Sequence, residues 1–140
     1  ANDSIFVLVP SRREKDFLKS EELWWQHILR IFVKPDFQPS NILQLFSGSY
    51  DVQQIVAYLP IENRVIYVAQ APNPWNMHVY STPAYEKFNL TEQGQCLTCG
   101  FSQCTYQDRA SLSPGEELKL NFWCLGPVSP YQSLIFLDKK

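Results

Sequence analysis

Glycine, histidine and methionine are all scarce in this chain. Among its 140 residues there are 5 glycines, 2 histidines and 1 methionine. A loop that cradles phosphate needs several glycines, and the sequence has no Gly-rich loop, no G-x-S-x-G and no H-E-x-x-H motif. A single methionine also argues against an adaptable Met-rich binding surface. The sequence therefore lacks the motifs of the common catalytic classes, which favours a protein without enzymatic activity.

An excess of one charge and a long apolar run are missing as well. The 12 basic and 14 acidic residues give a formal net charge of −2, so no global field attracts nucleic acid. Residues 5–9 form a short apolar run that Pro10 ends, whereas a membrane helix needs about 20 residues. We therefore expect no membrane span, and the charge balance argues against nucleic acid as a partner.

What the chain does have is the composition of a folded protein. Hydrophobic residues make up 45% and charged residues 19%, which argues against disorder. A chain of this length buries its own core, so we expect residues 1–140 to form a single domain. The chain starts at Ala1, and this start fits a processed secreted protein and removal of an initiator methionine equally well.

The N-terminal third predicts one amphipathic helix. Between residues 17 and 33 the apolar side chains fall on one broad arc at helical spacing, with Lys19, Gln26 and Arg30 opposite. Ser20 suits the N-cap of this helix, and Pro35 ends it. The apolar arc consists of Phe17, Leu18, Trp24, Trp25, Ile28, Leu29, Ile31 and Phe32.

The rest of the chain predicts strands. Residues 52–59 and 64–69 have strand composition and flank a turn at residues 60–63, so they are expected to form a hairpin. Shorter strands are expected at residues 5–9, 77–80 and 133–137. The resulting fold class is α+β: one N-terminal amphipathic helix packed on an antiparallel sheet or on a partly closed β-barrel.

A second hairpin is predicted around the turn signal Ser113-Pro114-Gly115-Glu116. Centring it on Pro114 places residues 105–108 opposite residues 120–123. The same register places Cys104 opposite Cys124. This geometry favours a cross-strand disulfide between these two cysteines.

The four cysteines are Cys96, Cys99, Cys104 and Cys124. They leave a disulfide framework and a zinc site open. Disulfides allow three connectivities, and Cys96 and Cys99 are not expected to pair with each other in a structural role. Zinc could use all four thiolates, although only the first two have paired spacing. We therefore expect no cofactor, with structural zinc as the alternative.

The sequence of Asn89-Leu90-Thr91 matches a glycosylation sequon, which makes Asn89 a glycosylation candidate. Together with disulfides, a sequon favours a secreted or lumenal location. An intracellular location remains the alternative, and it would go with zinc or free thiols.

No catalytic residues are predicted. His27 and His78 are the only imidazoles, and no sequence motif assigns either of them to catalysis, while the carboxylates are spread over turns and strand ends. Aromatic residues in Pro-rich loops remain, because such side chains bury area at low entropic cost. The predicted binding residues are Trp75, Asn76, His78 and Tyr131.

These observations predict a non-enzymatic binding or interaction module, secreted or lumenal, that recognises another protein through aromatic Pro-rich loops. One alternative is an intracellular zinc-stabilised β-rich subunit of a protein or nucleoprotein assembly. The other is a small-ligand carrier with a barrel fold.

Overall fold

The regular secondary structure of the described residues is entirely β. The computed structural model describes residues 3–12, 24–36, 38–45, 50–71, 73, 75–85, 94–100, 104–113, 118–127 and 130–137. The strands in these ranges are β1 (Asp3–Arg12), β2 (Trp24–Val33), β3 (Pro39–Gln44), β4 (Val52–Leu59), β5 (Arg64–Ala69), β6 (His78–Pro83), β7 (Gln95–Cys96), β8 (Cys104–Ser113), β9 (Leu118–Pro127) and β10 (Tyr131–Leu137).

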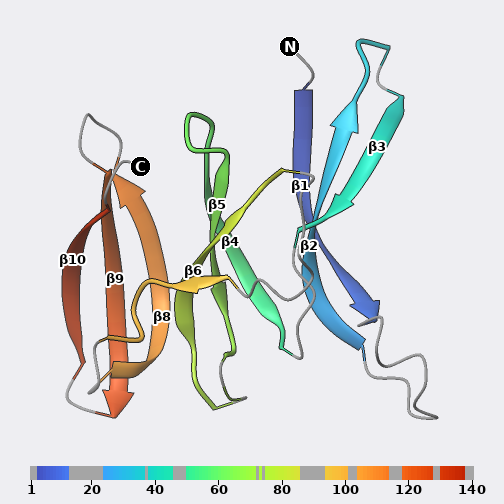
Figure 1. Cartoon of the computed structure of the whole chain (residues 1–140). Helices are drawn as coiled ribbons and strands as arrows, with labels where there is room; N and C mark the ends of the chain where they lie inside the picture. The colour runs from blue at the N-terminus through green and yellow to red at the C-terminus, as the bar shows by residue number, and fades with distance from the viewer. Residues whose placement is uncertain are drawn as a thin grey trace.

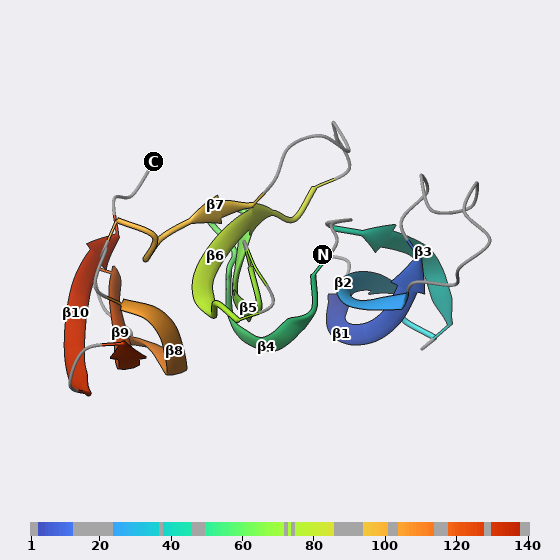
Figure 2. The same ribbon diagram turned by 90° about the horizontal axis from the view of Figure 1, so that it is seen from below.

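The strands form three antiparallel sheets, each a meander of strands that follow one another in the chain. Their orders are β1-β2-β3, β4-β5-β6-β7 and β10-β9-β8. The sheets stand side by side, with the β4–β7 sheet between the other two (Figures 1 and 2). The predicted α+β class is therefore wrong: the described residues contain no helix, and their strands do not close a barrel.

The middle sheet is buried on both faces, which explains the apolar run of β5. Successive side chains of a strand point to opposite faces. Val65, Tyr67 and Ala69 accordingly pack in one core, between the middle sheet and the β1-β2-β3 sheet. Ile66 and Val68 pack in the other core, against β8 and β9. Each neighbouring sheet thus covers one face of the middle sheet.

The segment that was expected to be a helix is strand β2. It pairs with β1 in a regular antiparallel register, with Leu8 opposite Ile28. The neighbours His27 and Ile28 point to opposite faces and are both 0% exposed, so both faces of β2 are covered at this point. A strand buried on both faces shows no polar alternation, and its apolar run also fits a helical arc. The predicted cap, Ser20, lies outside the described residues.

Arg30 of β2 connects the first sheet to the middle sheet. Its guanidinium donates to the hydroxyl of Ser4 at 3.0 Å, to Oδ1 of Asn63 at 2.9 Å and to the carbonyl of Ala84 at 2.7 Å. A fourth hydrogen bond reaches the hydroxyl of Tyr58 at 3.2 Å. The residue is buried, and the guanidinium also lies over the aromatic rings of Phe6, Phe32 and Tyr58. All four acceptors are neutral, so these bonds satisfy the donors of Arg30 without balancing its charge.

The hairpin predicted for residues 52–59 and 64–69 is confirmed as β4 and β5, with Leu59 opposite Arg64. The short strand expected at residues 77–80 is realised as β6, which begins at His78. Strand β10 covers residues 133–137 but is only partly buried, because Leu134 is 49% exposed.

The hairpin of β8 and β9 exists, but its register differs from the prediction. Gln107 lies opposite Cys124, and Cys104 lies opposite Pro127. Residues 105–108 therefore do not face residues 120–123. The cause lies at the turn, because Ser113 already lies opposite Lys119, whereas a hairpin centred on Pro114 would place it opposite Gly115. The bulges between Cys104 and Arg109 add only local shifts of one residue.

Candidate functional site

The loop between β5 and β6 presents an exposed tryptophan next to a hydrogen-bonded asparagine pair. The side chain of Trp75 is 72% exposed, whereas the adjacent Asn76 is buried. The N–H of Asn76 donates to the carbonyl of Asn73 at 3.0 Å. The side-chain amide of Asn73 in turn donates to Oδ1 of Asn76 at 3.1 Å. These two bonds close a tight turn with Trp75 inside it.

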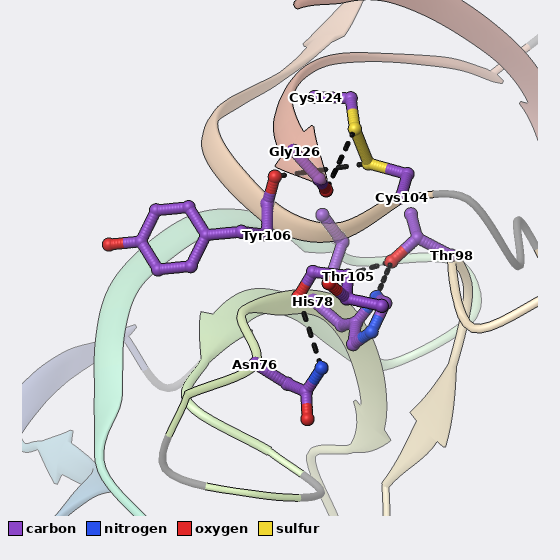
Figure 3. The surroundings of a disulfide bond; sticks show 9 residues. Asn76, His78, Thr98, Cys104, Thr105, Tyr106, Cys124 and Gly126 are labelled. Carbon is purple, nitrogen blue, oxygen red and sulfur yellow. Dashed lines mark hydrogen bonds between the residues drawn. A yellow bond between two sulfur atoms is a disulfide. The ribbon is translucent and has the colours of Figure 1, made fainter. Parts of the chain in front are cut away.

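The same loop is fastened to strand β8 of the third sheet. The N–H of Met77 donates to the carbonyl of Thr105 at 2.9 Å, and the N–H of Gln107 donates to the carbonyl of Met77 at 3.0 Å. The side-chain amide of Asn76 also donates to the carbonyl of Thr105, at 3.4 Å (Figure 3). Asn76 and Met77, which follow Trp75, are therefore fastened to β8, and this lowers the entropic cost of ordering the backbone next to Trp75.

His78 lies directly after this loop, and its side chain is buried and in polar contact with Thr98. Its Nδ1 lies 2.9 Å from the hydroxyl of Thr98 (Figure 3). The same hydroxyl accepts a hydrogen bond from the N–H of Val79 at 3.1 Å. Thr98 is 0% exposed. Burial lowers the pKa of His78 below its ordinary value, because the charged imidazolium is disfavoured away from water. Burial therefore favours the neutral form of His78.

The four cysteines form two disulfides of different exposure. Cys104 bonds to Cys124, the pairing that the sequence favoured, and both residues are 0% exposed. Figure 3 shows this disulfide beside the carbonyl oxygens of Tyr106 and Gly126. Their contacts with Sγ are 3.8 Å for Tyr106 and 3.5 Å for Gly126. Because disulfide sulfur carries no proton, these are contacts and not donated hydrogen bonds.

The other disulfide joins Cys96 to Cys99, contrary to the expectation that these two do not pair. The chain turns between them, which brings their Cα atoms to 5.7 Å, a separation that a disulfide bridges. Cys96 is partly buried and Cys99 is exposed. A ring nitrogen of His78 and the two sulfur atoms all lie within 4.8 Å of one another.

The structure brings together three of the four residues predicted to bind a partner. Trp75, Asn76 and His78 follow one another along the β5–β6 loop and the start of β6. Tyr131 begins β10 in the third sheet, opposite Cys124, and is partly buried. The glycosylation candidate, Asn89, lies outside the described residues. A role in binding remains a prediction for each of these side chains.

Sequence reasoning missed the role of Thr98, which sits between the two cysteines of the C-x-x-C segment. It also missed a buried tyrosine cluster. The hydroxyl groups of Tyr50 and Tyr67 lie 3.1 Å apart, and the Tyr67 ring stacks on Tyr80 with a centroid distance of 5.7 Å. Burial raises the pKa of all three, that of Tyr80 to about 12. The high proportion of aromatics was the available signal, but it does not say which rings meet.

Comparison with known proteins places the fold in a family. Residues 2–131 match the family described as the dipeptidyl peptidase IV (DPP IV) N-terminal region. The chain belongs to this family. The N-terminal region of dipeptidyl peptidase IV is of the β-propeller type. This type agrees with the successive antiparallel meanders of the chain, which pack face to face.

Two curated relatives are similar to the chain over most of its length. The proteins named inactive dipeptidyl peptidase 10 from Mus musculus and from Rattus norvegicus are each 29% identical to it over 116 residues. The alignment covers 81% of this chain but 14% of each relative, so the chain spans a small part of their length. Among the described residues, no helix is long and apolar enough to cross a membrane.

Proposed function

We propose that this chain is a non-catalytic protein-interaction module of a DPP IV-type β-propeller and contacts its partner through Trp75. The observation that carries this proposal is the exposed tryptophan on a loop that is hydrogen-bonded both internally and to β8. A large aromatic side chain on a preorganised backbone is the kind of residue that dominates binding energy at protein interfaces.

The absence of catalysis is supported by the state of the imidazoles. The chain has 2 histidines, and His27 and His78 are 0% and 4% exposed. A general base must reach the proton that it abstracts, and neither ring is placed to meet a substrate in solvent. The relatives are also named inactive, which agrees with a role in binding.

The compartment that fits this function is extracellular or lumenal. Both pairs of cysteines form disulfides, and disulfides persist in oxidising compartments. In this oxidised chain no four-thiolate zinc site is available, which removes the main support for the intracellular zinc-stabilised subunit. The ligand-carrier alternative loses its support because the described strands form open sheets and no barrel.

Site-specific photocrosslinking on the full-length protein tests this function. A photoreactive amino acid with a large aromatic side chain, which keeps a ring at the contact, replaces Trp75 in one sample and Ile61 in the other. Ile61 is the matched control because it is 95% exposed but lies in the β4–β5 turn, at the opposite end of β5. The proposal predicts that position 75 yields one crosslinked protein of defined mass and position 61 does not.

Competition then separates specific from adventitious capture. Unlabelled wild-type protein should abolish the crosslink at position 75, whereas an equal amount of the Trp75→Ala variant should compete at least about tenfold less well. Equal labelling at both positions, or equal competition by both proteins, would refute Trp75 as the contact.

A further inference from the structure

The cluster of His78, Cys96 and Cys99 combines an imidazole with a disulfide that solvent can reach. The three ligand atoms of the cluster lie within 4.8 Å of one another, and their residues come from β6, from β7 and from the turn after β7. In the oxidised chain the two sulfur atoms are bonded to each other and have no thiolate to offer a metal. Two thiolates become available for a metal ion when the Cys96–Cys99 bond is reduced.

The two disulfides differ in their access to a reductant. Cys99 is exposed, whereas Cys104 and Cys124 are 0% exposed. Thiol–disulfide exchange requires a thiolate to reach one sulfur of the bond, so access decides which disulfide reacts first. A dithiol reductant therefore reaches the Cys96–Cys99 bond while the Cys104–Cys124 bond stays protected by the fold.

Opening of the Cys96–Cys99 bond is a two-step thiol–disulfide exchange. A thiolate of the external dithiol attacks Sγ of Cys99 and forms a mixed disulfide, and Cys96 leaves as a thiolate. The second thiol of the reductant resolves the mixed disulfide. In total two electrons and two protons pass to the cysteine pair, and the reductant becomes a cyclic disulfide.

The two sulfur atoms of the reduced pair can reach the spacing of a tetrahedral zinc site by moving apart. Two thiolates at about 2.3 Å from one tetrahedral zinc ion stand about 3.8 Å apart. The sulfur atoms must separate from bonding distance to reach this spacing. Cys99 lies in an exposed turn, so its side chain can move while Cys96 remains in β7.

Thr98 prepares the imidazole for metal binding. A hydroxyl has one proton and two lone pairs, and the Thr98 oxygen uses one lone pair for the N–H of Val79. The other lone pair can accept a proton from Nδ1 of His78, which lies 2.9 Å away. In that tautomer Nε2 carries a free lone pair, and the hydrogen bond fixes the ring as such bonds do in protein zinc sites.

We infer that reduction of the Cys96–Cys99 disulfide creates a zinc-binding site in which Cys96, Cys99 and His78 are the ligands and water takes the fourth position. The exposed side of Cys99 leaves that fourth position open to solvent. The chain therefore binds the metal at this site only when the Cys96–Cys99 disulfide is reduced.

Cobalt binding tests the site, because thiolate-to-cobalt charge transfer gives a visible absorption band. The protein is first treated with a limiting amount of a water-soluble phosphine, which reduces one disulfide and becomes the phosphine oxide. Alkylation and peptide mapping should then find label on Cys96 and Cys99 and none on Cys104 or Cys124. Label on the buried pair first would overturn the inference.

The selectively reduced protein should bind one Co²⁺ per chain, and Zn²⁺ should displace it. The oxidised protein should show no band. We expect His78→Ala to weaken Co²⁺ binding at least about tenfold, and Thr98→Val to weaken it about 10–100-fold, as loss of an outer hydrogen bond to a metal-ligating histidine does. An unchanged affinity in His78→Ala would overturn the site as proposed.

A measurement on the wild-type chain avoids dependence on the folding of a buried-residue variant. With ¹¹³Cd²⁺ bound to the reduced protein, NMR should show scalar coupling from cadmium to an imidazole proton of His78 and to the β-protons of both cysteines. Coupling to the cysteines without coupling to His78 would contradict the ligand set.

Discussion

The hydroxyl oxygen of Thr98 lies 2.9 Å from Nδ1 of His78 in the interior of the protein. This contact ties the C-x-x-C segment to β6, directly after the loop that carries Trp75. Because the same oxygen accepts the N–H of Val79, one side chain satisfies two buried groups of the neighbouring strand.

Thr98→Val should therefore destabilise the protein. The change keeps the shape of the side chain but leaves Nδ1 of His78 and the N–H of Val79 without their partner. Such unsatisfied buried groups cost about 1–3 kcal/mol. Urea unfolding monitored by fluorescence gives the free energy of unfolding. Thr98→Ser is the control, since it keeps the hydroxyl, and equal losses in both variants would contradict this role.

Gly94→Ala should also reduce the free energy of unfolding. A Cβ at this position would collide with the hydroxyl of Tyr67 and would lie 3.3 Å from the carbonyl of Ser81. Tyr67 is 0% exposed and stacked on Tyr80, so it has little room to move. Overpacking of this kind costs about 1–3 kcal/mol.

Gly100→Ala is the matched control for that measurement. A Cβ at Gly100 meets no atom within 4 Å. The Gly100 variant should unfold at the same urea concentration as the wild type or slightly higher, because alanine restricts the unfolded chain. If the two alanine variants were equally stable, the close packing of Gly94 against Tyr67 would be wrong.

Replacing Arg30 should weaken the attachment of the first sheet to the middle sheet. Arg30→Lys keeps the positive charge, but one ammonium group cannot make the four hydrogen bonds of the planar guanidinium. Lysine should therefore not replace arginine at this position. We expect the free energy of unfolding to fall by about 1–3 kcal/mol, since the buried oxygen atoms that accept from Arg30 lose their donor.

Lys34, an exposed cation directly after β2, provides the control for Arg30. Lys34→Met should change the free energy of unfolding by less than about 0.5 kcal/mol, because Lys34 is exposed. Full stability of Arg30→Lys in the same urea titration would show that the hydrogen bonds of the guanidinium do not hold the two sheets together.

The buried tyrosine cluster predicts a loss of stability at high pH. Burial raises the pKa of Tyr80 from the ordinary value of 10.0 to about 12, and it raises the pKa values of Tyr50 and Tyr67 as well. Since the folded state holds these protons more tightly than the unfolded state, their contribution is complete below pH 10. It is lost as the pH rises through about 12.

Tyrosinate absorbance checks this pH dependence. During an alkaline titration, the part of the signal that belongs to the cluster should appear late or together with unfolding, and Tyr80→Phe should reduce that late part. Ionisation of all 7 tyrosines of the chain near pH 10 without unfolding would be incompatible with a buried cluster.

Local signals in the sequence predicted part of the fold correctly. The β4–β5 hairpin follows from two strand-like segments flanking a four-residue turn, and each signal is contained in a few neighbouring residues. The Cys104–Cys124 disulfide was favoured on the same local basis. The pairing nearest the turn puts Ser113 opposite Lys119, so Cys124 lies opposite Gln107, and a count centred on Pro114 cannot foresee this offset.

The errors come from tertiary burial. His27 and Ile28 are covered on both faces by parts of the chain that the local pattern of β2 does not reveal, and the apolar run was therefore assigned to a helix. The Cys96–Cys99 disulfide depends on the turn that the chain makes between them. In the candidate site, the exposure of Trp75 agrees with its assignment as a surface aromatic, whereas the partnership of His78 with Thr98 needed the structure.

The account stands most directly on the contribution of Trp75 to affinity for the protein that crosslinks at that position. Binding of that partner to the wild type, Trp75→Ala and Ile61→Ala is measured by titration calorimetry, after circular dichroism has shown all three proteins folded. The account predicts that Trp75→Ala weakens the affinity at least about tenfold, or about 1.4 kcal/mol, and that Ile61→Ala changes it less than about twofold. Equal affinity of Trp75→Ala and the wild type would contradict it.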